Sequence, residues 1–380
     1  MTALALTDAI LFTGEAFVEG QTLLVQDGKI VDIVAKGSVP AGFERVSCAH
    51  SILAPAFIDC QVNGGGNVLL NATPTAEGVL TIARAHRKTG TTRLLPTCIS
   101  DTPDVMAASL QAVRAARVAD SSILGIHFEG PHLSPELSGA HDLSLIRPME
   151  DRDEALYRAQ EGEVFLLTLS PEQVSLDQIS KIKRQGVIVS IGHCAASLEQ
   201  VQTAIDAGVT GFTHIMNRMP PVRTREPGVA VLALNDTTTY AGVILDGMHL
   251  HPELARLVVR SKAEDKLFMV SDAAPPAGAE TPLPYVMGGE RVVPDAQGRC
   301  INDKGVITGA HRTLGECVPV AIRDIRLDPE RVLRMASTIP AAFLGLGDRF
   351  GKLLPGFVAD IVQLDHGFKV QRVWQDGVTV

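Results

Sequence analysis

Strand-like runs alternate with helical patterns along most of this 380-residue chain. The runs are short, apolar and rich in β-branched residues, and the segments between them carry apolar residues at helical spacing, as in residues 104–118. Such alternation indicates βα units around a parallel sheet, and eight units fit a closed barrel better than an open sheet. We therefore predict the α/β class, with a (β/α)8 TIM-like barrel whose strands are Ala56–Val62, Thr92–Thr97, Ile123–Glu129, Val164–Leu169, Val187–His193, Gly211–Ile215, Tyr240–Leu245 and Leu267–Ser271.

The two ends of the chain have a different pattern. Residues 22–34 alternate apolar and polar positions around Asp27-Gly28, a dipeptide typical of a hairpin turn. The C-terminal stretch repeats this pattern, with Asp376-Gly377 as its turn, so we expect the two ends to pair. The predicted divisions are a small β-sandwich domain from residues 1–52 and 351–380, a barrel from residues 53–350, and an inserted hairpin at about residues 280–305 within the barrel.

The segment from residue 186 to residue 217 reads as one strand–helix–strand unit in which each strand ends on a histidine. Ser197, with Gln200 three positions later, forms a capping box that predicts the start of the helix. In a parallel α/β fold the two histidines, His193 and His214, would both lie at the carboxyl edge of the sheet, where active sites are built. A single histidine is more often a buried core residue, but this paired placement favours a shared metal ion.

Composition narrows the class of protein. A formal net charge of −9, with no basic run to offset it, argues against nucleic acid as a partner. No apolar run approaches the roughly 18 residues of a membrane helix, and the N-terminal stretch lacks a basic leader, so we expect a soluble cytoplasmic protein with no membrane partner. The six cysteines show no paired spacing and are expected to be reduced core residues.

Charged and imidazole side chains at the predicted strand ends are the candidate functional residues. Two imidazoles and one carboxylate are a recurrent zinc-binding set that leaves a position for water, so Glu129, His193 and His214 are the predicted ligands. A buried carboxylate tied to a neighbouring strand is the alternative interpretation of Glu129. His249 follows the seventh strand, and Asp272 follows the eighth.

Three of these interpretations have rivals. His127 lies two residues before Glu129 on the same strand face, but deeper in the barrel, which favours a supporting or core position. Cys194 stands beside His193, yet adjacent strand residues point to opposite faces, which favours core packing. Asp272 could be the general base that takes a proton from the attacking water, or it could be a helix cap before Ala-Ala-Pro-Pro.

Several segments, in order, resemble the N-acetylglucosamine-6-phosphate deacetylases of the amidohydrolase superfamily. The resemblance covers nearly the whole chain and includes APAFIDCQVNG, GIHFEGPH, THIMNRM, REPG, DGMH and SDAAPPAG. The closing Pro355-Gly356 and Ala359-Asp360-Ile361 are also similar to superfamily features. This resemblance implies deacetylation of N-acetyl-D-glucosamine 6-phosphate, with Asp272 as catalytic acid/base and His249 polarising the amide carbonyl.

The same resemblance implies a substrate site and a homodimer. Arg225 would reach the phosphate in the neighbouring subunit, although arginines in a Pro-rich loop are by default solvated charges. Its clustering with Arg218 in an acidic chain does offer a local phosphate clamp. The residues implied to line the sugar phosphate are Ala140, Asn217, Arg218, Asp246, Gly247, Met248, His249, Ile307, Thr308, Gly309 and Ala310.

The chain departs from the pattern of two-metal superfamily members. These carry His-x-His at the end of the first strand, whereas this chain has Gln61 and Asn63, whose neutral amides are poor zinc ligands. We therefore expect one divalent metal ion per subunit, Zn²⁺ first, with Fe²⁺, Co²⁺ and Mn²⁺ as alternatives. Arg218 and His311 stand where smaller residues are usual, and Ala56 stands where glycine is usual.

Two other functions compete with this one. Another amidohydrolase substrate, such as N-acetylgalactosamine 6-phosphate or a cyclic amide, would use the same residues. A sugar-phosphate binding protein without catalysis is the non-enzyme alternative, and the intact set of Glu129, His193, His214 and Asp272 argues against it.

Overall fold

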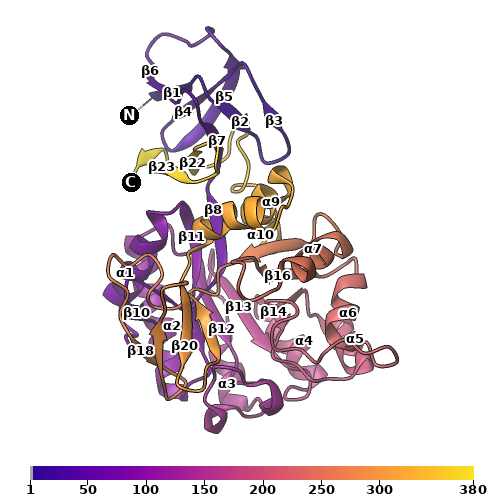
Figure 1. The fold of residues 1–380 in the computed structure, drawn as a ribbon. Coiled ribbons are helices and arrows are strands. Elements are labelled where there is room, and N and C mark those ends of the chain that lie inside the picture. The colour runs from indigo at the N-terminus through magenta and orange to yellow at the C-terminus, as the bar shows by residue number, and fades with distance from the viewer. Residues whose placement is uncertain (1–2) are drawn as a thin grey trace.

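An eight-stranded parallel barrel forms the centre of the molecule (Figure 1). The computed structural model describes residues 3–380. Each barrel strand pairs in parallel with the next one in the chain, and a bridge between Val62 and Ala273 joins the first strand to the segment after the last. The barrel strands are β8 (Phe57–Val62), β11 (Thr91–Ile99), β12 (Gly125–Glu129), β13 (Val164–Leu169), β14 (Val187–Ile191), β15 (Gly211–Phe212), β16 (Tyr240–Ile244) and β17 (Leu267–Val270). The predicted barrel, with all eight predicted strands in order, is confirmed.

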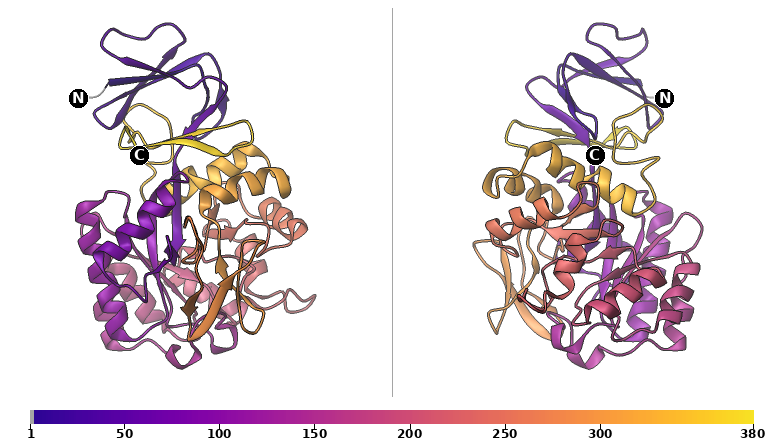
Figure 2. Two further views of the ribbon diagram at one scale, coloured as in Figure 1. Left: turned by 60° about the vertical axis from the view of Figure 1, so that its left-hand side comes forward. Right: turned by 90° about the vertical axis from the view of Figure 1, so that its right-hand side faces the viewer.

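Helices cover the outside of the barrel, as Figure 2 shows from two further sides. The helix predicted after His193 begins with the predicted capping box, in which Ser197 and Gln200 satisfy each other's backbone N–H groups, and it ends at Gly208 with φ 133°. No helix in residues 3–380 is long and apolar enough to cross a membrane. The helices are α1 (Ala76–Arg87), α2 (Pro103–Ala119), α3 (Asp151–Leu156), α4 (Leu176–Arg184), α5 (Leu198–Ala207), α6 (Gly228–Asn235), α7 (Pro252–Ser261), α8 (Leu314–Pro319), α9 (Pro329–Ala336) and α10 (Thr338–Phe343).

A layer of hydrogen-bonded polar side chains crosses the barrel interior. His127 Nε2 lies 2.7 Å from Thr168 Oγ1, which in turn lies 2.6 Å from Thr213 Oγ1. Thr97 Oγ1 accepts a hydrogen bond from the backbone of Val62 and lies 3.3 Å from His127 Nδ1. Each of these buried groups has a hydrogen-bond partner. Their hydrogen bonds join strands β8, β11, β12 and β13 to one another and to Thr213, which follows β15, near the carboxyl ends of the strands.

Both ends of the chain build the small β-domain that stands above the barrel in Figure 1, as predicted. The turns at Asp27-Gly28 and Asp376-Gly377 join paired antiparallel strands. One sheet contains β5 (Lys29–Ala35), β4 (Gln21–Gln26), β1 (Ala3–Thr7) and β6 (Glu44–Ser47). The other contains β24 (Val378–Thr379), β23 (Val370–Gln375), β22 (Ile361–Leu364), β7 (Ile52–Pro55), β2 (Ile10–Phe12) and β3 (Phe17–Val18).

A second small sheet follows the eighth barrel strand, where we predicted one hairpin. It has four antiparallel strands, because the chain turns back twice more and continues to Ala310. The last strand touches the barrel end through a bridge between Ala273 and Ala310, so residues 307–310 reach the active-site face. These strands are β18 (Tyr285–Met287), β19 (Glu290–Pro294), β20 (Arg299–Asn302) and β21 (Ile307–Ala310), and a two-stranded ribbon of β9 (Gly64–Gly65) and β10 (Val68–Leu69) lies after β8.

Candidate metal centre and active site

The candidate site lies where β12, β14, β15 and β17 end. Glu129 is the last residue of β12, and His193, His214 and Asp272 each come two residues after a strand. These three residues have positive φ angles of 48°, 30° and 51°. A residue with a Cβ adopts this region at a cost, and such strain gathers at functional sites, where it directs side chains that a regular strand would point elsewhere.

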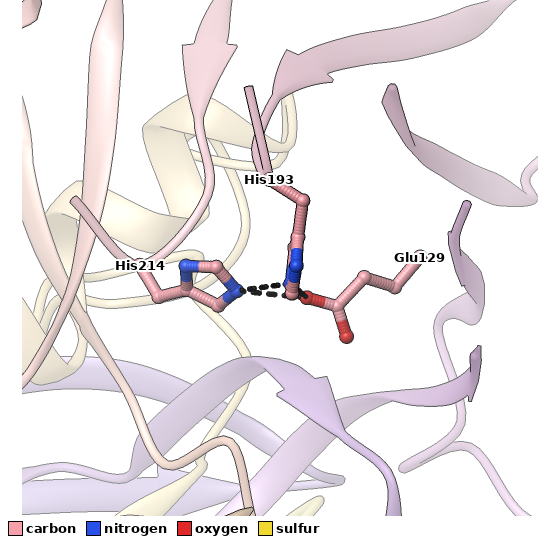
Figure 3. Close-up of side chains that lie close together, drawn as sticks. All are labelled: Glu129, His193 and His214. Carbon is pink, nitrogen blue, oxygen red and sulfur yellow. Dashed lines mark hydrogen bonds and ion pairs between the residues drawn. The ribbon is translucent and has the colours of Figure 1, made fainter. Parts of the chain in front are cut away.

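Three side-chain atoms converge at the centre of this site (Figure 3). Nε2 of His193 lies 3.2 Å from Glu129 Oε1, Nε2 of His214 lies 2.8 Å from the same oxygen, and the two Nε2 atoms are 3.1 Å apart. Two ligands of a tetrahedral zinc ion, each about 2.05 Å from it, lie about 3.3 Å apart. The donor set and its spacing therefore fit one small divalent ion.

The second ring nitrogen orients His193 but in His214 has no partner within residues 3–380. Nδ1 of His193 donates to the carbonyl of Leu137 across 2.8 Å, which leaves the lone pair of Nε2 directed at the centre. Nδ1 of His214 is buried without a partner among the described residues. Although burial opposes ionisation, the two imidazole rings beside it hold the pKa of Glu129 well below its usual value. The carboxylate is thus ready to bind a cation.

Asp272 lies beside this cluster and is held by two neutral amides. Gln61 Nε2 donates to Oδ1 of Asp272 and to Oε1 of Glu129, both across 3.0 Å, and Asn63 Nδ2 donates to Oδ1 of Asp272 across 2.7 Å. Burial, together with the charge of Glu129, raises the pKa of Asp272. The amides that replace a second pair of metal ligands therefore fix the orientation of this carboxylate.

His249 forms a second acid–base pair at the rim. Its Nδ1 donates to Oδ2 of Asp246 across 2.7 Å, while Oδ1 of Asp246 accepts the backbone N–H groups of Met248 and His249. Burial opposes the charged imidazole, but the hydrogen bond and charge of Asp246 raise the pKa of His249. The ring is therefore oriented and polarised by a carboxylate that is itself fully buried.

A cavity of about 450 Å³ opens above these groups, and most of the predicted substrate residues line it. Asp246, Gly247 and Ala310 do not line the cavity, and neither does the exposed Arg225. Asp246 reaches the site only through His249. The predicted residues on the cavity wall are Ala140, Asn217, Arg218, Met248, His249, Ile307, Thr308 and Gly309.

The two rival metal ligands lie outside the cluster. His127 takes part in the threonine layer below it, and burial lowers the pKa of its ring to about 4, so the imidazole is neutral. Cys194 is buried in the main hydrophobic core, where burial raises the pKa of its thiol to about 12. Neither residue joins the group of Glu129, His193 and His214 that could hold an ion.

His141 is a residue of the site that was not predicted from the sequence. This buried ring lines the cavity, lies edge-on to His193 with ring centroids 4.7 Å apart, and has its Nδ1 2.8 Å from Ser100 Oγ. It lies in a loop, far from the end of any barrel strand in sequence, so strand-end reasoning could not select it. Its position directly after Ala140, which the family resemblance did indicate, was the available signal.

Comparisons with known proteins agree with this architecture. The matching family model, described as the Amidohydrolase family, covers residues 52–380. The chain is 38% identical over 327 residues to an N-acetylgalactosamine-6-phosphate deacetylase of Shewanella sp. (strain ANA-3), covering 86% of this chain and 82% of that one. It is 31% identical to an N-acetylglucosamine-6-phosphate deacetylase of Danio rerio, covering 96% and 93% of the two chains.

A solved structure gives the same result for the fold. The crystal structure of N-acetylglucosamine-6-phosphate deacetylase from Pasteurella multocida matches with a TM-score of 0.95 at 29% identity, covering 100% of this chain and 99% of that one. The family match, the identity and the shared fold together show that this chain is an amidohydrolase and belongs to the family of the N-acetylglucosamine- and N-acetylgalactosamine-6-phosphate deacetylases.

Proposed function

We propose that this chain hydrolyses the acetamide of N-acetyl-D-glucosamine 6-phosphate to D-glucosamine 6-phosphate and acetate. The observation that carries this proposal is the convergence of Glu129, His193 and His214 beside Asp272 at the base of one cavity. The names of the Danio rerio and Pasteurella multocida proteins supply the substrate class.

In this proposal Glu129, His193 and His214 hold one divalent ion, with Zn²⁺ expected first and Fe²⁺, Co²⁺ and Mn²⁺ as alternatives. Two imidazole nitrogens and one carboxylate oxygen suit all four ions, and zinc prefers the tetrahedral spacing described above. When bound, the ion polarises the acetamide carbonyl and lowers the pKa of the attacking water.

Asp272 moves the proton. Its Oδ1 accepts both amide donors, whereas its Oδ2 accepts no hydrogen bond from a described residue. Oδ2 is therefore the oxygen that takes a proton from the attacking water as the new C–O bond forms. The same proton then passes to the amine nitrogen as the C–N bond breaks, which releases acetate and the free amine.

His249 and the cavity wall orient the substrate. With Nδ1 of His249 donating to Asp246, which favours the charged ring, Nε2 of the protonated ring is the atom left to donate to the acetamide oxygen. Asn217 contributes a buried side-chain oxygen that has no partner among the described residues, and this oxygen can accept a hydrogen bond from a sugar hydroxyl.

The proposal also includes a cytoplasmic homodimer in which Arg225 reaches the neighbouring site. Arg225 is exposed and lies outside the cavity of its own chain, which leaves it available to another subunit. All six cysteines are buried free thiols, as expected in a reducing compartment.

Metal analysis followed by acetate-release assays tests this function. The purified protein should release acetate from N-acetylglucosamine 6-phosphate, and a chelator should abolish this release. N-acetylgalactosamine 6-phosphate should be assayed beside it, because the Shewanella relative at 38% identity is named for that sugar. Absence of acetate release from both sugars by the metal-loaded protein would exclude the proposed function.

A further inference from the structure

The cavity wall includes one arginine, Arg218. Arg218 is the only lysine or arginine among the described residues that line it. The two carboxylates on the cavity wall have other proposed roles, Glu129 as a metal ligand and Asp272 as the acid/base. The ion pairs around the site join histidines to Glu129 or to Asp246, the pair of Arg223 and Glu226 lies outside it, and none includes Arg218. A half-buried guanidinium without a carboxylate partner is a ready partner for an anion.

The backbone around Arg218 fixes the path of its side chain. Arg218 and Met216 both have positive φ angles, of 53° and 75°, in the loop that follows the metal ligand His214. The side chain of Arg218 runs across Gly139, where a Cβ atom would lie only 2.7 Å from its Nε. The absence of a side chain at Gly139 therefore makes room for the arginine. Packing against this glycine restricts the side chain of Arg218, so that less conformational entropy is lost when the arginine binds an anion.

We infer that Arg218 binds the phosphate of the substrate within its own subunit, so that selection for a phosphorylated sugar does not depend on a neighbouring chain alone. This inference rests on the proposed function and deepens it. The planar guanidinium can hold two phosphate oxygens at once, whereas Arg225 is exposed and lies outside the cavity of its own chain.

Steady-state kinetics with matched substrates test the inference. We would measure kcat/KM for N-acetylglucosamine 6-phosphate and for N-acetylglucosamine with the wild type, Arg218→Ala, Arg218→Lys and Arg225→Ala. The preference is the ratio of kcat/KM for the phosphorylated sugar to kcat/KM for the unphosphorylated sugar. In Arg218→Ala this ratio should be at least tenfold lower than in the wild type, mainly through a higher KM for the phosphorylated sugar, because a charge-assisted hydrogen bond is lost. Lysine should restore part of the preference, because it keeps the charge but not the bidentate geometry. Arg152→Ala, an exposed arginine that does not line the cavity, is the matched control.

Binding of inorganic phosphate provides a readout that does not depend on activity. Calorimetric titration of the metal-loaded protein should show phosphate binding that weakens at least tenfold in Arg218→Ala and not in Arg152→Ala. Equal losses of kcat/KM for both sugars, or phosphate affinity unchanged in Arg218→Ala, would overturn the inference. If the wild type releases no acetate, the proposed function fails, while loss of phosphate binding in Arg218→Ala would still support the anion site.

Discussion

The side-chain amide of Asn63 donates a hydrogen bond to Oδ1 of Asp272 across 2.7 Å. Gln61 makes a second such bond to the same oxygen. These donors stand at the positions where two-metal relatives are expected to carry histidines, and they orient the proposed acid/base without adding charge. The arrangement implies one metal ion and one proton-transferring carboxylate, and each can be tested.

Substitution of Asp272 by asparagine should separate catalysis from folding. Asparagine has nearly the same shape but cannot hold the transferred proton, so kcat should fall by roughly a hundredfold or more while KM changes much less. The circular dichroism spectrum and the metal content should stay at wild-type values. A kcat near that of the wild type would show that Asp272 is only a structural residue.

Metal stoichiometry should be close to one divalent ion per chain after loosely bound ions are removed. The three converging ligand atoms make one site, and Gln61 and Asn63 offer no second set of ligands. Elemental analysis of the wild type and of His214→Ala would check this, with the latter expected to retain far less metal. A ratio near two in the wild type would contradict the prediction.

The joint between the barrel and the small β-domain should depend on Arg93. This buried guanidinium donates to Asp360 across 2.6 and 3.0 Å and to Asp376 across 2.6 Å. Removing one partner leaves uncompensated buried charge, so Arg93→Ala should lower the free energy of unfolding by about 3–5 kcal/mol. The exposed Arg84, paired with Glu77, is the control, and Arg84→Ala should cost less than about 1 kcal/mol in the same urea titration. Similar costs for both variants would contradict this view of the joint.

Stability should fall at mildly acidic pH because of His132. Burial lowers the pKa of this histidine to about 4, whereas the unfolded chain gives it an ordinary value of about 6.5. The unfolded state therefore binds the proton more readily than the folded state. The contribution of His132 to the free energy of unfolding is complete above pH 6.5 and is lost as the pH falls towards 4. Between pH 7.5 and 5 this one group should cost about 2 kcal/mol of unfolding free energy.

A paired variant isolates that contribution. In urea titrations, His132→Gln should show a smaller loss of stability between the two pH values than the wild type does. His366→Gln, which changes an exposed histidine, should behave like the wild type. If His132→Gln and the wild type lose stability equally, the acid sensitivity comes from other groups.

The sequence by itself determined the barrel and the residues that lie at the carboxyl ends of its strands. Strand periodicity, the capping box at Ser197 and the glycine stop at Gly208 are local signals, and local signals survive in any tertiary context that satisfies them. Parallel strands joined by helices must place their carboxyl ends on one face, so His193 and His214 could be brought together on topology alone. The number of strands in the inserted sheet was underestimated, because the predicted hairpin ended at about residue 305, inside the short turn that joins β20 to β21.

The tertiary structure decided how the side chains meet. The positive φ angles at His193, His214 and Asp272 turn these residues inward, and no spacing rule predicts such angles for a residue with a Cβ. His141 reaches the site from a loop that is distant in sequence, and Arg218 lies over Gly139 because that position has no side chain. Contacts of this kind depend on the course of several loops at once, and a one-dimensional pattern carries no information about the distance between segments that only folding brings together.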